Sequence, residues 1–471
     1  MNEEHSGAKK PFYADIVAKQ KRHTHHAEKH SRNSDPHKSR TWSENPSKIR
    51  EQRPEPVHTY VPRKPFSPPK EGAPVFSALS KDSRVLLDSF PEVVNSVFPL
   101  DSKKKQLLSG QIRDLSHELT DERSSRRMGY MNDPAVLSAY IHYYMWWNLV
   151  RLTKIFASLP LQLEDDETAV DLGSGPLTVP IALWIARPDL RGKKIIWYCV
   201  DISQNALSAG EELFLSFAAR TGNVPWQIIR IKGECGVALR RRVSFVASAN
   251  MFNELFQDTA QPIEAQAKHH AETLISYAGQ NSSVLVVEPG IPRCGRFISL
   301  LRDSLARSGF SPVAPCPHDG ECPFPGLRQG KWCHFAFDTT SAPSGLLRLS
   351  EDAGLSKGRA VLSFIYSRRM ADIVDSSAEE KTETPLEMVS RMANLFPSLQ
   401  VRITSDIIKL PDHYTGRYGC SELGIVLVSG NWQAGDYLKN CVSGSLIMLP
   451  RPDRKNPERD PKTNALVIRL G

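Results

Sequence analysis

The sequence predicts an α/β fold in which crossover helices cover a mainly parallel β-sheet. From Thr168 onward, short apolar runs typical of strands alternate with longer segments of helical spacing, which is the order of βαβ units. A glycine-rich turn follows the first of these strands, and an acidic residue ends the second. Together these observations predict a ligand site at the tips of the strands.

The expected strands share a high content of aliphatic residues and a length of a few residues each. They are Ala169–Asp171, Ile195–Val200, Gln227–Ile231, Ser244–Ser248, Val284–Val287 and Arg359–Ser367. The expected helices connect them and are longer. They lie near Val179–Ala186, Ser203–Thr221, Pro262–Ala278 and Gly295–Ser308.

A helical domain, residues 76–165, is predicted to precede the sheet. Lys105–Leu119 carries apolar residues at three- and four-residue spacing. Asp133 is placed as an N-cap and Pro134 as the first residue of a helix that continues to Phe156. Aromatic residues on this helix are most simply interpreted as core packing, with a base-stacking platform as the alternative. They are Tyr140, Tyr143, Tyr144, Trp146 and Trp147.

Residues 1–75 are predicted to form a disordered basic arm that ends in a proline-rich linker, 61–74. Of the net charge of +8, residues 1–70 contribute most, with 15 Lys and Arg against 8 Asp and Glu. The segment has too few aliphatic residues to offset the entropy of ordering it. It is either a solubilising tail or a contact to the phosphate backbone of RNA.

The remaining boundaries follow from changes in composition. The sheet domain is expected to span 166–370 and to contain a cysteine loop, 311–340. An acidic loop, 372–384, and a small β-rich module with a clear strand at Leu423–Val428 are expected within 371–471. We find no apolar run long enough to span a membrane and no apolar leader segment. Eight cysteines in such a chain indicate a reducing compartment.

The loop Asp171-Leu172-Gly173-Ser174-Gly175-Pro176 is predicted to bind a cofactor, because its glycines let the backbone approach a ligand closely. A dinucleotide is disfavoured, since Thr178 replaces the third glycine of that fingerprint. The loop is similar to that of class I S-adenosylmethionine-dependent methyltransferases, which implies that Asp171 lies near the methionine amino group. Asp201 is placed to accept the ribose hydroxyls. Leu177 stands where many of these enzymes have glycine, and a Rossmann-like domain that binds no ligand is the alternative.

The fourth strand ends at Ser248-Ala249-Asn250-Met251-Phe252-Asn253-Glu254, the tip that faces the methyl acceptor in methyltransferases. Asn250 is the candidate for orienting that acceptor, although the Asn-Pro-Pro-Tyr of many amino-methylating enzymes is absent. No Pro-Cys or Thr-Cys pair occurs at this strand, which argues against cytosine-C5 methylation by a cysteine nucleophile. Helix capping and surface polarity are the alternative roles for Asn250, Asn253 and Glu254. The sequence therefore identifies no catalytic residue.

Three cysteines, Cys316, Cys322 and Cys333, lie in a polar loop rich in proline and glycine and predict a metal site. A fourth ligand is needed to close such a site, and the candidates are Cys420, His318 and His334. Irregular spacing with Cys-Pro pairs suits an iron–sulfur cluster, whereas zinc usually uses C-x-x-C knuckles, so zinc is the alternative. Other cysteines fit better as small buried hydrophobes. They are Cys199, Cys235, Cys294 and Cys441.

Together these residues resemble the methyltransferase-like proteins associated with the small ribosomal subunit of mitochondria, a family that also has bacterial members. The resemblance covers roughly 80–430. It rests on the Asp133-Pro134…Ala139-Tyr140 helix, the 171–176 loop, Val287-Glu288-Pro289-Gly290, Cys316-Pro317…Cys322-Pro323, Trp332-Cys333-His334-Phe335 and Tyr418-Gly419-Cys420.

The resemblance implies a class I methyltransferase domain with S-adenosylmethionine as cofactor and a 4Fe–4S cluster held by Cys316, Cys322, Cys333 and Cys420. It implies binding to small-subunit ribosomal RNA during ribosome assembly. We expect a monomer with no membrane partner, in a bacterial cytoplasm or, alternatively, in the mitochondrial matrix. Two other functions remain open, namely a non-catalytic iron–sulfur assembly factor and a zinc-stabilised small-molecule methyltransferase.

Overall fold

The computed structural model describes residues 66–120, 129–255, 261–324, 331–369, 398–452 and 457–471. All of them belong to one unit of the chain, Lys64–Gly471. Most of the expected basic arm lies outside the described residues, as do the acidic loop 372–384 and residues 325–330 of the cysteine loop. No helix in the described part is long and apolar enough to cross a membrane.

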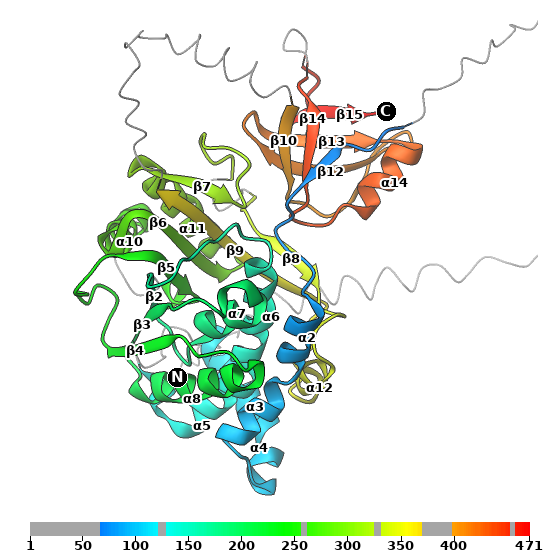
Figure 1. Ribbon diagram of the computed structural model, residues 1–471. Coiled ribbons are helices and arrows are strands. Elements are labelled where there is room, and N and C mark those ends of the chain that lie inside the picture. Colours follow the sequence, from blue (N-terminus) through cyan, green and yellow to red (C-terminus); the bar gives the residue numbers. More distant parts are fainter. Residues whose placement is uncertain (1–65, 121–128, 256–260, 325–330, 370–397, 453–456) are drawn as a thin grey trace, which may run out of the picture. The chain divides into compact units, whose positions relative to one another are not determined.

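The central sheet has the strand order β4-β3-β2-β5-β6-β9-β7, with β8 paired to β9 (Figure 1). Strands β2 to β6 pair in parallel, and β9 runs antiparallel to both β6 and β7. The antiparallel strand β9 lies next to the edge strand β7, and this arrangement is that of a class I methyltransferase-like α/β fold. From β2 the chain first adds β3 and β4 on one side of the sheet and then adds β5 on the other side. The point between β2 and β5 is therefore a topological switch point, which is where open sheets of this kind bind ligands.

The strands of the central sheet include all six that the sequence predicts. Strand β2 is buried on both faces, as expected of a central parallel strand. Their bounds are β2 Thr168–Leu172, β3 Ile196–Asp201, β4 Gln227–Lys232, β5 Val243–Ala249, β6 Ala278–Pro289, β7 Phe310–Ala314, β8 Phe335–Asp338 and β9 Arg359–Arg369.

The four expected helices of the sheet domain are present as α7, α8, α10 and α11 within a few residues, whereas η3, α9 and α12 were not predicted. Helix α7 is buried along its whole length because α6 packs against it. Gly222, in the left-handed conformation, ends α8. The bounds are α7 Thr178–Ala186, η3 Pro188–Leu190, α8 Gln204–Thr221, α9 Phe252–Leu255, α10 Ile263–Tyr277, α11 Pro292–Arg307 and α12 Ser344–Asp352.

The segment before the sheet is helical. Asp133 caps α5 as predicted, since its carboxylate accepts hydrogen bonds from the backbone N–H groups of Ala135 and Val136. The elements are α2 Lys81–Asp88, α3 Phe90–Val97, α4 Ser102–Thr120, η1 Tyr130–Asn132, α5 Pro134–Ala139, η2 Tyr140–Met145 and α6 Trp146–Phe156.

The single long helix expected after Asp133 is interrupted, because η2 is a π-helical turn. Tyr143, Trp146 and Trp147 are buried, which confirms core packing for these three aromatic residues. Tyr140 and Tyr144 are only partly buried, and their stacked rings have centroids 5.9 Å apart. Single π-turns inside helices are frequently found at functional sites.

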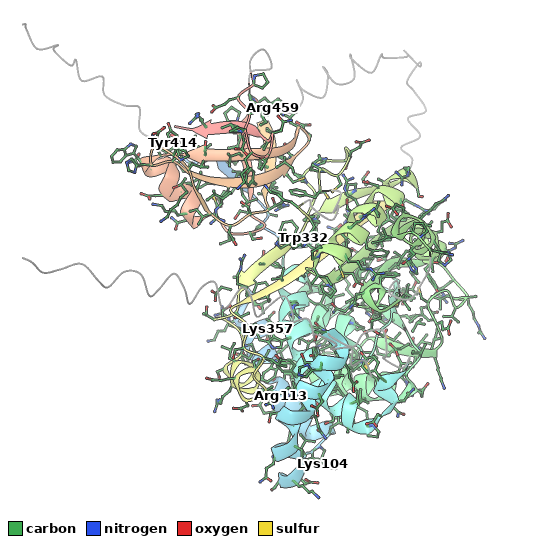
Figure 2. All side chains as sticks on the ribbon, turned by 180° about the vertical axis from the view of Figure 1, so that it is seen from behind. Lys104, Arg113, Trp332, Lys357, Tyr414 and Arg459 are labelled. Carbon is green, nitrogen blue, oxygen red and sulfur yellow. The ribbon has the colours of Figure 1, made fainter. Side chains whose placement is uncertain are left out.

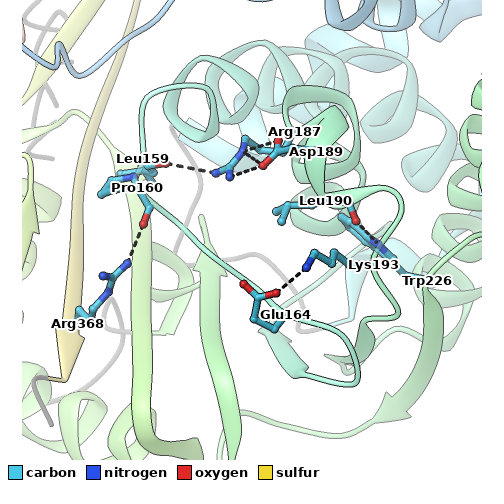
Figure 3. A network of polar contacts seen from close by, with 9 residues as sticks. All are labelled: Leu159, Pro160, Glu164, Arg187, Asp189, Leu190, Lys193, Trp226 and Arg368. Carbon is cyan, nitrogen blue, oxygen red and sulfur yellow. Dashed lines mark hydrogen bonds and ion pairs between the residues drawn. The ribbon is translucent and has the colours of Figure 1, made fainter.

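A polar network fixes the segment that enters the first strand of the sheet (Figure 3). The guanidinium of Arg187 donates to the carbonyl of Leu159 and pairs with Asp189 at 2.7 Å. Arg368 on β9 donates to the carbonyl of Pro160 at 2.7 Å. These contacts tie the segment that follows α6 to the end of α7 and to β9.

Residues from Ser398 onward form a second sheet with the order β1-β14-β10-β12-β13-β15, in which β11 also pairs with β12. One strand of this sheet, β1, was not expected there, since it comes from the end of the proline-rich linker. Lys70, Glu71 and Gly72 lack proline, so their N–H groups are able to pair with β14. The elements are β1 Lys70–Gly72, β10 Ser398–Ile403, β11 Ile408–Lys409, β12 Thr415–Ser421, β13 Gly424–Gly430, α14 Trp432–Asn440, β14 Leu446–Pro450 and β15 Leu466–Leu470.

Candidate functional site

A cavity of about 330 Å³ opens at the carboxyl ends of β2, β3 and β5. Gly173 and Gly175 contribute from the loop after β2, Asp201 from the end of β3, and Asn250 from the turn after β5. The sequence predicts each of these four residues as part of the cofactor site. The structure therefore brings together groups that are up to 77 positions apart, because parallel strands end at one edge of the sheet.

Asp201 is a fixed acceptor on the wall of this cavity. One carboxylate oxygen accepts a hydrogen bond from the backbone N–H of Gly175 and the other from that of Ser203, both at 2.8 Å. Burial raises the pKa of this carboxyl, and the two N–H groups act in the opposite direction. Asp201 thus locks the glycine loop to the tip of β3.

Asp171 has a different environment beneath the same loop. It is fully buried, and neither carboxylate oxygen has a hydrogen-bond partner among the described residues. Desolvation raises the pKa of this carboxyl well above its usual range. Asp171 does not line the cavity itself, and its assignment to the cofactor amino group stays a prediction.

The glycine loop has the conformations that its composition suggests. Gly173 has φ +69°, and a Cβ at this position would lie 2.6 Å from the side chain of Met251. Ser174 is buried and its hydroxyl donates to the carbonyl of Asp171 at 2.8 Å. Only glycine combines this backbone with such a close neighbour, so the loop passes directly beneath the turn after β5.

Leu177 explains the one departure from the methyltransferase pattern in this loop. It precedes α7 with φ +56°, in the left-handed region that favours glycine. Its side chain is completely buried in the core. The backbone therefore keeps the geometry of the glycine that is usual there, while the leucine adds apolar contact.

The turn after β5 is fixed by a buried carboxyl from β6. The two Glu288 oxygens accept hydrogen bonds from the backbone N–H groups of Phe252, at 2.9 Å, and Asn253, at 3.0 Å. Burial raises the pKa of Glu288 to about 8. Asn250 has φ +57°, and its N–H donates to the carbonyl of Val287. The side chain of Asn250 is thereby presented to the cavity.

Sequence reasoning missed several residues of this cavity. Tyr130 and Tyr140 line it from η1 and η2, and the Tyr130 hydroxyl donates to Glu254 at 3.4 Å. His269 and His270 line it from α10, and burial lowers the pKa of His270 to about 4. The adjacent histidines were a signal in the sequence, whereas nothing there indicated the π-turn.

A second, small cavity collects all four cysteines that the family resemblance implies as ligands. Cys316 and Cys322 come from the loop after β7, Cys333 from the segment before β8, and Cys420 from β12. His318 also lines this cavity, and its Nε2 lies 3.2 Å from the Cys420 sulfur. His334 is not among the lining residues.

Two buried arginines surround the cysteines. Arg302, 3% exposed, donates to the Cys316 sulfur at 3.3 Å and to the carbonyl of Gly320. Arg402, 5% exposed, donates to the carbonyls of Pro315 and Gly444. Arg302 thus ties α11 to the cysteine loop, and Arg402 on β10 ties that loop to the C-terminal sheet.

The metal centre predicted for these cysteines is not shown. In the described part of the chain, no three His, Cys, Asp or Glu side chains are arranged to hold a metal ion. Burial raises the pKa of Cys316 to about 11, and it also raises those of Cys333 and Cys420. Of the cysteines expected to be simple hydrophobes, Cys199, Cys294 and Cys441 are buried and Cys235 is half-buried.

Comparison with known proteins gives one family match. A family model described as "Mitochondrial small ribosomal subunit Rsm22" matches residues 165–372, less than half of the chain. No curated protein matches.

Several solved structures are similar. One is a SAM-dependent methyltransferase from Geobacter sulfurreducens in complex with S-adenosyl-L-homocysteine, with 14% identity, 54% of this chain and 97% of that chain covered, and a TM-score of 0.29. Another is a putative class I S-adenosylmethionine-dependent methyltransferase from Listeria monocytogenes, with 10% identity, 67% and 97% covered, and a TM-score of 0.28. A methyltransferase from Pyrococcus furiosus has 11% identity, 44% and 77% covered, and a TM-score of 0.25.

Proposed function

We propose that this protein is an S-adenosylmethionine-dependent methyltransferase-like protein that acts on the RNA of the small ribosomal subunit. The observation that carries this proposal is the cavity at the switch point of the sheet, where Asp201 holds Gly175 of the glycine loop. The family match to a mitochondrial small-subunit protein supports the ribosomal partner. It also favours the mitochondrial matrix over a bacterial cytoplasm.

The residues at the first cavity fit the cofactor chemically. Asp171, beneath the glycine loop and outside the cavity lining, is a buried carboxyl without a hydrogen-bond partner in the described chain, and such a group suits the positive amino group of the cofactor. Asp201 keeps lone pairs for the ribose hydroxyls. Gly173 and Gly175 line the cavity on the side of the glycine loop, with Ser174 buried between them, and Asn250 lines it toward the acceptor. When bound, the cofactor supplies a methyl group on a sulfonium.

The contribution of the protein to transfer is then mainly positioning. A rigid turn after β5, held by Glu288, presents Asn250 so that an acceptor nitrogen or oxygen can be aligned with the methyl group. A cysteine nucleophile is disfavoured on geometry and charge. Cys235 is the cysteine that lines this cavity, and burial raises its pKa to about 11, which keeps it a poor nucleophile at neutral pH.

A labelled-methyl assay on immature small ribosomal subunits tests the proposal. We expect the purified protein to bind S-adenosylhomocysteine and to transfer label from labelled S-adenosylmethionine to the RNA. A protein that binds the cofactor and the subunit without transfer would be a non-catalytic assembly factor. That second function is favoured by the turn after β5, which lacks the Asn-Pro-Pro-Tyr of many amino-methylating enzymes.

The partner is tested separately by co-sedimentation with small subunits at increasing salt. Binding to RNA phosphates should weaken steeply as salt rises, because each neutralised phosphate releases counterions. Sedimentation that does not depend on salt would argue against RNA as the partner. A protein that sediments alone at every salt concentration would refute the ribosomal assignment.

We further propose that Cys316, Cys322, Cys333 and Cys420 hold a 4Fe–4S cluster. A single zinc ion needs its ligand atoms about 2.3 Å away, and no such group exists among the described residues. A cluster is larger and takes its four thiolates on separate irons. Four thiols around one cavity, with Arg302 donating to a sulfur, are a suitable donor set. Zinc without iron or sulfide in anaerobically purified protein would support the zinc-stabilised alternative.

A further inference from the structure

We propose that a second cavity beside the cofactor cavity is a subsite for a phosphate group of the methyl acceptor, bound by Arg151 and Lys357. This cavity has a volume of about 190 Å³. It shares the lining residues Tyr130, Tyr140, Asn250 and Glu254 with the cofactor cavity, so the two cavities meet at these side chains. The inference deepens the proposed function, because it gives the acceptor a charge and a position.

Arg151 provides the first cation. It lies on α6, and its guanidinium donates to the amide oxygen of Asn148 at 2.9 Å. Its Nε–H is buried and has no hydrogen-bond partner among the described residues. Leaving a buried charged donor unpaired is unfavourable, so this group is suited to bind a ligand oxygen.

Lys357 provides the second cation from a different part of the chain, the segment between α12 and β9 (Figure 2). Its ammonium group lies 5.7 Å from the ring centroid of Tyr143 and 6.0 Å from that of Trp147. No hydrogen bond or ion pair of this ammonium occurs within the described residues. Burial and the nearby charge of Arg151 lower the pKa of Lys357 to about 8.

Neither Arg151 nor Lys357 forms an ion pair with a carboxyl group of the described residues at this cavity. Burial raises the pKa of Glu288 to about 8, although the two backbone N–H groups that its oxygens accept act in the opposite direction. Glu254 lies on the side shared with the cofactor cavity and accepts from Tyr130. Two cations that line one cavity, where the charge of Arg151 helps to lower the pKa of Lys357, favour an anion between them.

The shape and place of the cavity favour a phosphate. A phosphate has several strongly accepting oxygens, so it can satisfy the Arg151 fork and the Lys357 ammonium at once. The stacked rings of Tyr140 and Tyr144 line the same cavity, where they offer a surface for a base of the RNA acceptor next to the phosphate. Asn250 stands between this place and the cofactor cavity, where an acceptor would meet the methyl group.

Titration of the full-length protein with inorganic phosphate by calorimetry, at constant ionic strength, tests the proposal. We expect Arg151→Met and Lys357→Met each to weaken phosphate binding by about tenfold to a hundredfold, because each removes a charge-assisted hydrogen bond. Methionine retains much of the apolar stem. The matched control is Lys154→Met on the same helix, whose ammonium lies over Phe337 and not in this cavity. Equal phosphate affinity in all four proteins overturns the proposal, as does acetate binding as tightly as phosphate.

A second measurement needs no variant. Acylation of lysines in the wild-type protein, read by peptide mass spectrometry, should be slowed at Lys357 by phosphate and unchanged at Lys154. Unchanged modification of Lys357 at high phosphate overturns the subsite even if a variant fails to fold. Binding of S-adenosylhomocysteine, measured on the same samples, reports on the cofactor site alone. If the wild-type protein bound phosphate but not S-adenosylhomocysteine, the proposed cofactor would be refuted and the phosphate subsite would stand.

Discussion

The cofactor cavity and the cysteine cavity carry opposite charge. Acidic side chains line the first, namely Asp201, Glu234 and Glu254, and no lysine or arginine lines it among the described residues. Arg302 and Arg402 line the second, with no carboxylate among its described residues. Under the proposed function, the first suits a ligand with a sulfonium and an amino group, and the second suits an anionic cluster. The two cavities therefore differ in the charge of the ligand that they favour.

The largest effect is expected from removing a cysteine ligand. Cys420→Ser should abolish nearly all iron and acid-labile sulfide in anaerobically purified protein, because serine does not replace a thiolate in the cluster. Iron and sulfide analysis with the visible absorption spectrum gives the measurement. The control is Cys441→Ser, because Cys441 is a buried cysteine that directly follows α14 and does not line the cavity. If Cys420→Ser kept its full iron content, the ligand set would be wrong.

A smaller effect is expected from removing one negative charge from the acidic cofactor cavity. Asp201→Asn should lower the affinity for S-adenosylhomocysteine by roughly a hundredfold, or about 3 kcal/mol. Asparagine has a single carbonyl oxygen, so it cannot serve both backbone N–H groups and the ribose.

Calorimetric titration measures this loss, with Asp189→Asn as the control. Asp189 is an exposed partner of Arg187 outside the cavity. An Asp201→Asn protein with unchanged affinity would show that this carboxylate does not contact the cofactor.

Glu288 extends the comparison of charges, because it is a buried carboxyl with a raised pKa next to the acidic cofactor cavity. Burial raises its folded pKa to about 8 from 4.5. The folded protein then holds a proton that the unfolded chain has lost, so stability is full below about pH 4.5 and falls as the pH rises to about 8. The loss amounts to roughly a few kcal/mol.

Denaturant unfolding of the wild type and of Glu288→Gln across pH 5 to 9 measures this dependence. The variant cannot titrate, so we expect its stability curve to be flatter in that range. Glu212→Gln, at an exposed position of α8, is the control and should follow the wild type. A Glu288→Gln curve parallel to the wild type would contradict the raised pKa.

Much of the sheet domain was predictable because short apolar runs and glycine-rich turns are local signals in the sequence. The strands β2 to β6 and the positions of Asp201 and Asn250 follow from such signals. The cavity walls from η1 and η2 were not predictable, since a π-turn depends on packing and leaves no pattern in the sequence. The same holds for Lys357, which meets Arg151 only through the fold.

The cysteines show the other limit. Spacing identified the three in the loop and left Cys420, His318 and His334 as candidates for the fourth ligand. The family resemblance chose Cys420, because a strand residue 87 positions after Cys333 carries no local mark of a ligand. Arg302 and Arg402 were missed entirely. Basic residues in a helix and a strand look like surface charge until the fold buries them.

The smallest effect tests the backbone of the cofactor loop at Leu177. In an ordinary helix, glycine is less stable than alanine by about 1 kcal/mol. At φ +56° the order should reverse, so Leu177→Gly should be more stable than Leu177→Ala by about 1 kcal/mol. Both variants lose the same buried side chain to a similar extent, and their difference therefore isolates the backbone.

Unfolding free energies of the two variants provide the measurement, and the same pair at Leu183 provides the control. Leu183 is equally buried but lies inside α7, where alanine should be the more stable replacement. If alanine were also better at Leu177, the left-handed turn would not be what this loop requires. A leucine at this position would then be ordinary core packing, and the likeness of the loop to the glycine-containing methyltransferase pattern would extend to its sequence but not to its backbone.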